Sequence, residues 1–136
     1  MNASAWPPHI LIHTLAAGAA LLIGLLQLAG AKGTLTHRRL GWTWVALMLV
    51  VAGSSLLMRD TGMVNLAGFT PIHLFTLLTL VLLPVAVHRA SRHDRAGHAR
   101  AMTGLISGAL VIAGLFTLAP GRRLGTLLWS ALGLTG

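Results

Sequence analysis

The stretch HRRLGWTWVALMLVVAG, residues 37–53, decides the fold because its pattern recurs in HARAMTGLISGALVIAG, residues 98–114. Each copy starts at a histidine beside basic residues, continues as an apolar run and ends in LVVAG or LVIAG. Another histidine lies at a similar distance upstream of each copy, His13 before the first and His73 before the second. Internal repeats indicate duplicated structural units. We therefore predict two helical hairpins, each with one histidine near its start and another at its turn.

The composition indicates an integral membrane protein. Of the 136 residues, 55% are hydrophobic and only 9% are charged, whereas a soluble domain carries about 25% charged residues. Four apolar runs are long enough to cross a hydrocarbon core of about 30 Å. We predict an all-α membrane bundle of four helices, built as a single transmembrane domain over residues 1–136. Its expected parts are hairpin one at about 9–58, hairpin two at about 71–119 and a short C-terminal apolar segment at 120–136.

Local signals refine the four expected spans. The spans lie at about 9–30, 37–58, 71–88 and 98–119. Thr34 or Thr36 can cap the second span, because a threonine hydroxyl accepts a hydrogen bond from a free N–H group of the first helical turn. Pro84 lies inside the third span and should kink it. Residues 124–136 are apolar but too few to cross a bilayer, so we predict a helix at the interface or against a partner.

The basic residues predict the orientation in the bilayer. Ten Lys and Arg against two Asp give a net charge of +8, and most of these cations flank the first and third turns. Because cytoplasmic loops are enriched in Lys and Arg, we predict a multi-pass protein of the bacterial inner membrane with both termini outside. Arg122 and Arg123 count against this orientation, and Arg59 lies beside Asp60 in the middle connection. The orientation of the protein in the bilayer accounts for the excess of Lys and Arg. We therefore expect contact with the lipid bilayer and none with nucleic acid.

The topology sorts the seven histidines into two levels. The outer level holds His9, His13 and His73, and the inner level holds His37, His88, His93 and His98. A helix rises 1.5 Å per residue, so the two levels lie roughly 25 Å apart and any sites they form are separate. Ionisable side chains within a span are candidates for function, and neutral imidazole is a ligand for haem iron, zinc or copper. The competing interpretation is hydrogen bonding at the interface, or simple solvation for His88 and His93.

The side chains available as ligands suit haem better than a bare metal ion. Zinc favours three or four converging ligands, and the outer level offers His9, His13, His73 and Asp60 alone. A bis-histidine haem needs one imidazole from each of two facing helices. Glycines give a flat macrocycle room to approach, although they serve helix packing equally well. The candidates are Gly18, Gly24, Gly53, Gly104, Gly108 and Gly114.

We therefore predict that His13 and His73 ligate an outer haem b and that His37 and His98 ligate a possible inner one. Arginines at the two faces, Arg38 inside and Arg122 outside among them, could pair with haem propionates or anchor helix ends. Gln27 lies deep in the first span and could hydrogen-bond across the bundle or lie near a quinone, with ordinary packing as the competing interpretation.

Other chemistries lack the residues that they need. The chain has no cysteine, which excludes disulfides, thiolate metal sites and iron–sulfur clusters. No carboxylate lies within a span, which argues against a proton relay built from carboxylates. Ser54 and Ser55 have no obvious base and acid partners, which argues against a serine hydrolase.

These residues also carry a resemblance. His37-Arg38-Arg39-Leu40-Gly41, an HRxxG element after the first span, occurs together with Gln27, Lys32-Gly33, His73 and His98. In this the chain resembles a group of small bacterial four-helix membrane proteins of unknown function over residues 9–119. More distantly, it is similar to the two-haem membrane cytochrome b superfamily. That resemblance implies bis-histidine haem b and transmembrane electron transfer. Many such cytochromes carry both histidines of a helix on one long span, so the outer pair matches the resemblance better.

Three functional hypotheses follow. The leading one is a b-type cytochrome, or the haem subunit of a membrane redox complex, that passes electrons between quinone and a partner at the outer face. The alternative is a cofactor-free accessory or assembly subunit of a larger membrane complex, which would use its glycine-rich faces and C-terminal helix for contact. The third is a metal-handling membrane protein that uses the outer histidines. The sequence leaves enzymatic activity and oligomeric state open.

Overall fold

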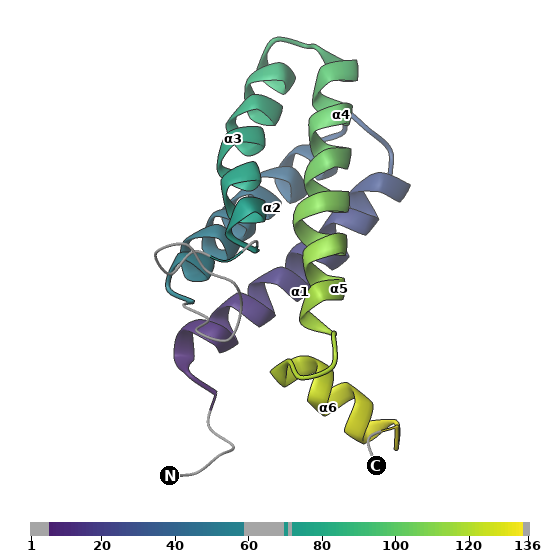
Figure 1. Cartoon of the computed structure of the whole chain (residues 1–136). Helices are drawn as coiled ribbons and strands as arrows, with labels where there is room; N and C mark the ends of the chain where they lie inside the picture. The colour runs from purple at the N-terminus through teal and green to yellow at the C-terminus, as the bar shows by residue number, and fades with distance from the viewer. Residues whose placement is uncertain (1–5, 59–69, 71, 135–136) are drawn as a thin grey trace.

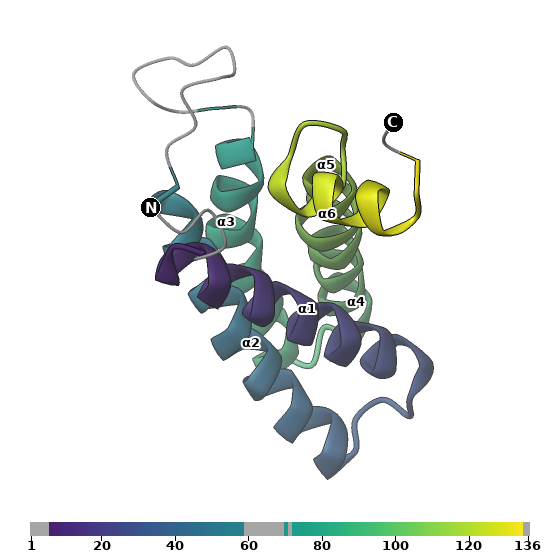
Figure 2. The same ribbon diagram turned by 90° about the horizontal axis from the view of Figure 1, so that it is seen from below.

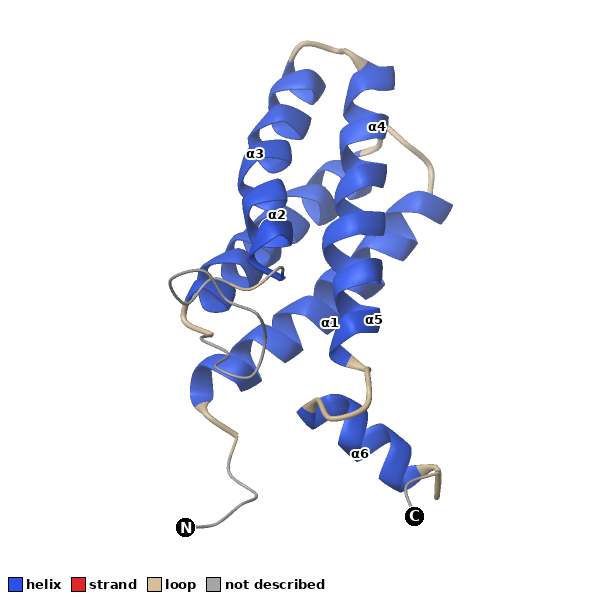
Figure 3. Ribbon diagram, viewed as in Figure 1, coloured by secondary structure: helices blue, strands red, loops and turns tan. Residues whose placement is uncertain are grey.

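A computed structural model describes residues 6–58, 70 and 72–134 of the chain. Throughout these ranges the regular structure is helical, with no strand (Figure 3). The helices are α1 (Pro8–Ala29), α2 (Leu35–Leu56), α3 (Ile72–Ser91), α4 (Arg95–Gly104), η1 (Leu105–Ile112), α5 (Ala113–Thr117) and α6 (Arg123–Ala131). The predicted all-α class is therefore confirmed.

Four helices are long and apolar enough to cross a membrane. They are α1, α2, α3 and the continuous helix Arg95–Thr117 that α4, η1 and α5 form together. The prediction of four spans plus a further helix is thus confirmed, with small differences in the bounds. The third span continues beyond His88 to Ser91, and the fourth begins before His98 at Arg95, so the turn between them is shorter than expected.

Side-chain caps define where two of the helices begin. Thr34 accepts a hydrogen bond from the backbone N–H of His37 at 3.0 Å, so it is the cap of α2, one of the two threonines predicted. Asp94 does the same for α4, accepting from the backbone N–H of Gly97 at 2.9 Å. Such caps satisfy N–H groups that the first turn leaves without a partner inside the helix. Both caps bring a histidine into the first turn of its helix, namely His37 in α2 and His98 in α4.

The fourth span contains a π-helical segment that the sequence did not predict. Between Leu105 and Ile112 the helix widens to π geometry and returns to α geometry at Ala113. Its core-facing residues are Leu105, Ile106, Ala109 and Leu110. The π-helix is rare and occurs mostly within α-helices at functional sites. Here it packs against both α1 and α3, so the widened segment lies where the two hairpins meet.

The two hairpins pack across each other. In Figure 1, α3 and α4 stand side by side while α1 and α2 cross behind them at a slant, and Figure 2 shows α1 and α2 lying alongside each other. The centre of the core is formed by Trp44, Met48 and Leu105, whose side chains are fully buried. The outward faces carry many exposed leucines, such as Leu15 and Leu22 on α1. An apolar exterior of this kind suits a surface that faces lipid.

The C-terminal helix α6 folds back against the end of the fourth span. It lies apart from α1, α2 and α3 in both views (Figures 1 and 2). The indole N–H of Trp129 donates to the backbone carbonyl of Leu118 at 3.0 Å, and Gly125 lies against the carbonyl of Ala119 so closely that a side chain would not fit. The helix ends at Ala131, which is shorter than the predicted segment 124–136. Its location at the membrane interface stays a prediction.

Candidate functional site

The structure brings the inner pair of histidines together. His37 lies in the first turn of α2 and His98 in the first turn of α4, and their ring centroids are 6.5 Å apart with 83° between the ring planes. Each ring therefore approaches the other from a different hairpin. Two imidazoles from different hairpins thus lie next to each other, one ring edge-on to the other.

A backbone carbonyl fixes the ring of His98. Its Nδ1 lies 2.8 Å from the carbonyl oxygen of Ala86 in α3. A carbonyl can only accept, so Nδ1 carries the proton and donates it. In the neutral ring this leaves the lone pair on Nε2. Histidines that bind metals commonly donate their other ring N–H to a carbonyl in this way, which sets both the tautomer and the ring orientation.

The ring of His37 has a buried nitrogen without a hydrogen-bond partner. Its Nδ1 is the single buried side-chain nitrogen or oxygen in this condition among the residues that the structure describes. Leaving a buried polar atom unsatisfied costs about 1–3 kcal/mol, and such an atom in a native protein calls for an explanation. Coordination to a metal would satisfy this nitrogen.

Gln27 holds the backbone of the His37 turn. Its side chain is buried, and Nε2 donates to the carbonyl oxygen of His37 at 3.1 Å. Gln27 therefore hydrogen-bonds from α1 to α2, the neighbouring helix of the same hairpin. A Cβ at Gly41 would come within 3.4 Å of the same Nε2. α1 thus closes against the first turns of α2 directly beside the histidine pair.

The outer histidine His13 joins α1 to α2. Its Nδ1 lies 3.1 Å from the carbonyl oxygen of Val51 and 3.0 Å from the hydroxyl of Ser54. Because the carbonyl can only accept, Nδ1 again carries the proton and Nε2 keeps the lone pair. The ring is thus held in the same tautomer as that of His98.

The contact with Ser54 corrects our prediction that this serine lacks a basic partner. It does not make Ser54 a nucleophile, since the hydroxyl donates its own proton to the carbonyl of Val50 at 2.6 Å and Nδ1 of His13 already carries a proton. A signal for this contact was present in the sequence. An antiparallel hairpin that turns at 30–34 places residue 13 opposite residues 51–54.

The other outer histidine, His73, has the opposite hydrogen-bonding pattern. The backbone N–H of Thr70 donates to its Nδ1 at 3.1 Å, and the hydroxyl of Thr70 lies at the same distance. Here Nδ1 accepts, so the neutral ring carries its proton on Nε2. For Nε2 of His73 to bind iron, the ring would have to release Thr70. Ligation of one haem by His13 and His73 stays a prediction.

The remaining predicted residues lie at the ends of the helices. Arg38 is exposed in the first turn of α2, and Arg122 precedes α6 at the opposite end of the fourth span. His88 and His93 are exposed beside the α3–α4 turn. Arg59 and Asp60 lie outside the described residues. Within 6–58, 70 and 72–134, no three His, Asp or Glu side chains form a group that could hold a metal ion.

The similarity to known proteins covers the four long helices. Residues 10–121 match the family described as "Predicted membrane protein (DUF2306)". The chain belongs to this family. Neither a curated protein nor a solved structure matches it. The resemblance to a family of membrane proteins of unknown function is confirmed at this level. The match carries no information about the HRxxG element, haem or cytochromes.

Proposed function

We propose that the chain is a small membrane cytochrome that holds one haem b between His37 and His98 and carries electrons within the membrane. The observation that carries the proposal is the approach of these two rings, one from each hairpin, to a centroid distance of 6.5 Å. Further support comes from the hydrogen bonding of their ring nitrogens and from the contacts that hold the two rings.

The closeness of the two rings would allow both imidazoles to hold one iron. His37 would reach it from the first turn of α2 and His98 from the first turn of α4, since their ring centroids are 6.5 Å apart. Imidazole nitrogens are ligands for haem iron.

The ring nitrogens also suit ligation. His98 presents the lone pair of Nε2, because Ala86 holds the proton on Nδ1. His37 offers a buried Nδ1 that has no other partner. Haem bound here supplies reversible one-electron transfer at iron. The chain's own residues orient the site, because Ala86 holds the ring of His98 and Gln27 holds the backbone of the His37 turn.

The protein around the site is expected to set the reduction potential of the bound haem. Burial, hydrogen bonds to the ligands and nearby charges set haem reduction potentials. Arg38, one residue after His37 and exposed in the first turn of the same helix, is the proposed partner of a propionate. A second haem at His13 and His73, with Arg122 as the proposed partner of a propionate, is a weaker part of the proposal because Nδ1 of His73 accepts from Thr70.

The cellular setting belongs to the same proposal. We place the protein in the bacterial inner membrane with both termini outside, because Lys32, Arg38 and Arg39 flank one inner turn and four arginines flank the other. Quinone in the bilayer is the proposed electron donor or acceptor, and a protein at the outer face is the proposed partner. A single chain or an oligomer is compatible with this arrangement.

Absorption spectra of the detergent-purified full chain test the proposal. Protein from haem-replete cells should show a Soret band that shifts on reduction with dithionite, together with sharp α and β bands. His37→Ala and His98→Ala should each lose the spectrum of six-coordinate haem. His93→Asn is the matched control, because His93 is exposed at the same end and asparagine tolerates its backbone φ of 58°.

Two results would overturn the cytochrome. A colourless preparation favours the cofactor-free accessory subunit. Stoichiometric copper or zinc in place of haem favours the metal-handling protein. Spectra that survive in both His37→Ala and His98→Ala but disappear in His13→Ala move the haem to the outer pair.

A further inference from the structure

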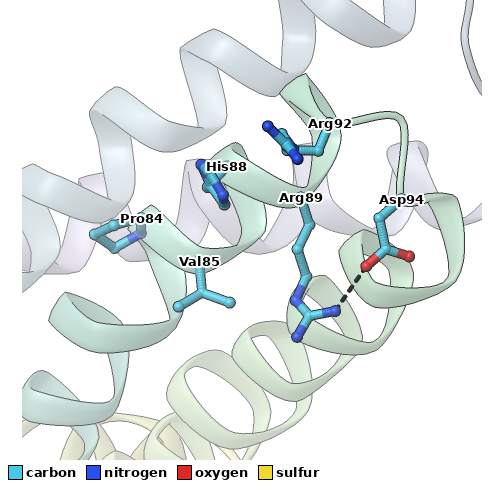
Figure 4. A pocket seen from close by; sticks show the side chains of 6 residues that line it. All are labelled: Pro84, Val85, His88, Arg89, Arg92 and Asp94. Carbon is cyan, nitrogen blue, oxygen red and sulfur yellow. Dashed lines mark hydrogen bonds and ion pairs between the residues drawn. The ribbon is translucent and has the colours of Figure 1, made fainter.

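A groove outside the histidine site runs along the end of α3. Its lining is formed by Pro84, Val85, His88, Arg89, Arg92 and Asp94, and its volume is about 640 Å³ (Figure 4). A second groove of about 420 Å³ shares Pro84 and His88 with it and extends to α2. The two grooves therefore adjoin at Pro84 and His88, and both are open to the surroundings; together we call them the channel.

The channel is apolar at one end and basic at the other. Between α2 and α3 its walls are the side chains of Val45, Leu49, Leu83 and Val87. The other groove combines Pro84 and Val85 with the charged side chains of Arg89, Arg92 and Asp94. Adjoining apolar and basic walls match a molecule that has a hydrocarbon part and an anionic part.

The basic end carries a net positive charge. Arg89 and Asp94 form an ion pair, with Nη1 of the arginine 2.6 Å from Oδ2 of the carboxylate. The backbone N–H of Gly97 and the Arg89 guanidinium hold the pKa of Asp94 below its usual range, so this pair remains ionised and neutral overall. Arg92 then supplies an uncompensated charge, and His88, one turn earlier on the same face of α3, adds a ring N–H donor.

The basic part of the channel lies at the end of a helix that is long and apolar enough to cross a membrane, which is where lipid headgroups are expected. α3 is a candidate span that ends at Ser91, so His88 and Arg89 lie in its last turn and Arg92 just beyond it. The apolar walls continue from there along the membrane-spanning part of α2 and α3. Basic pockets between transmembrane helices at the cytoplasmic side are suited to anionic lipid headgroups.

We propose that this channel binds an anionic phospholipid of the phosphatidylglycerol type. Its phosphate lies at Arg92 and His88, and one acyl chain lies against Val45, Leu49 and Leu83. A free phosphate ion would leave the apolar walls without a function, which is why a lipid is the better occupant. This site stands independently of the haem, because neither His37 nor His98 lines it.

Spin-labelled lipids test the site directly. The full chain is reconstituted in mixed vesicles of phosphatidylcholine and phosphatidylglycerol, and the motionally restricted fraction of each labelled lipid is measured by electron paramagnetic resonance. Labelled phosphatidylglycerol should be preferred over labelled phosphatidylcholine. Arg92→Gln should lower this preference about fivefold, the expected effect of removing one basic residue near an anionic headgroup.

Arg95→Gln is the matched control. It removes the same charge from the same turn at an exposed position that does not line the channel, so it should lower the preference only slightly. Equal effects of the two variants would overturn the proposal and leave a diffuse electrostatic attraction. Inorganic phosphate should not displace the labelled lipid. If it does, while the helical content stays unchanged, the site binds a free anion and the lipid proposal is wrong.

Discussion

The indole N–H of Trp44 donates to the backbone carbonyl of Ala20, 2.9 Å away, and this hydrogen bond ties the middle of α2 to the middle of α1. Both residues are fully buried. The close approach depends on Gly24, one turn further along α1, because a Cβ there would lie 3.2 Å from the indole nitrogen and 3.4 Å from Ile106. The first hairpin, the π-helical segment and the core thus meet around one tryptophan.

Enlarging Gly24 should therefore destabilise the bundle. Gly24→Leu forces atoms into the space that Trp44 and Ile106 occupy, and overpacking of this kind costs about 1–3 kcal/mol. Gly18→Leu is the control, since nothing lies within 4 Å of a Cβ at that position on the same helix. Thermal unfolding in detergent, followed by circular dichroism, should show a lower midpoint for the first variant only. Equal midpoints would show that α1 does not pack on Trp44 as described.

A buried hydroxyl pair should contribute measurably to the packing of α2 on α3. Ser55 and Thr76 lie with their hydroxyl oxygens 2.6 Å apart, and both side chains are buried. A double-mutant cycle of Ser55→Ala and Thr76→Val should give a coupling free energy of about 0.6 kcal/mol, within the range measured for hydrogen bonds between membrane helices. Additive effects in the unfolding free energies would mean that the two hydroxyls do not interact.

If haem lies between His37 and His98, the missing ligand should be replaceable. His98→Gly leaves a gap of the size of imidazole beside Ala86, so added imidazole should restore the six-coordinate spectrum. Without imidazole the reduced variant should bind carbon monoxide, which the intact site should resist because both axial positions are filled. A variant that binds haem normally without imidazole would contradict ligation by His98.

Asp94 should stabilise the α3–α4 turn in a pH-dependent manner. Its pKa is lowered by the Gly97 N–H and by Arg89, so its contribution is present at neutral pH and disappears as the pH falls through the lowered pKa. Asp94→Asn keeps a cap but not the charge, so its melting temperature should fall below that of the native chain at neutral pH and meet it in acid. Asp94→Ala removes the cap as well and should melt lower at every pH.

Much of the fold could be predicted from short stretches of the sequence. The four spans follow from runs of apolar residues, since each helix must satisfy its backbone hydrogen bonds internally within the membrane. The cap at Thr34 and the start of α1 at its prolines are equally local. The family match over residues 10–121 agrees with the membrane assignment. Each of these features depends on residues a few positions apart.

The site was only partly predictable. Pairing His37 with His98 followed from the repeated pattern, and the structure places these rings together. The contact of His13 with Ser54, the accepting nitrogen of His73 and the π-helical segment did not follow from any pattern that we recognised. The contact of His13 with Ser54 depends on how α1 and α2 are rotated relative to each other, whereas His73 and Thr70 are three residues apart and their contact depends on the local backbone.

The sequence by itself determined that this protein is a helical membrane protein and, to within a few residues, where its four long helices lie. Only the tertiary structure decided which side chains meet. The physical reason is that these helices are apolar on nearly all sides, so no hydrophobic stripe specifies which face turns inward. Their rotation is set by close packing at points such as Gly24 against Trp44, and by hydrogen bonds such as that from Gln27 to His37.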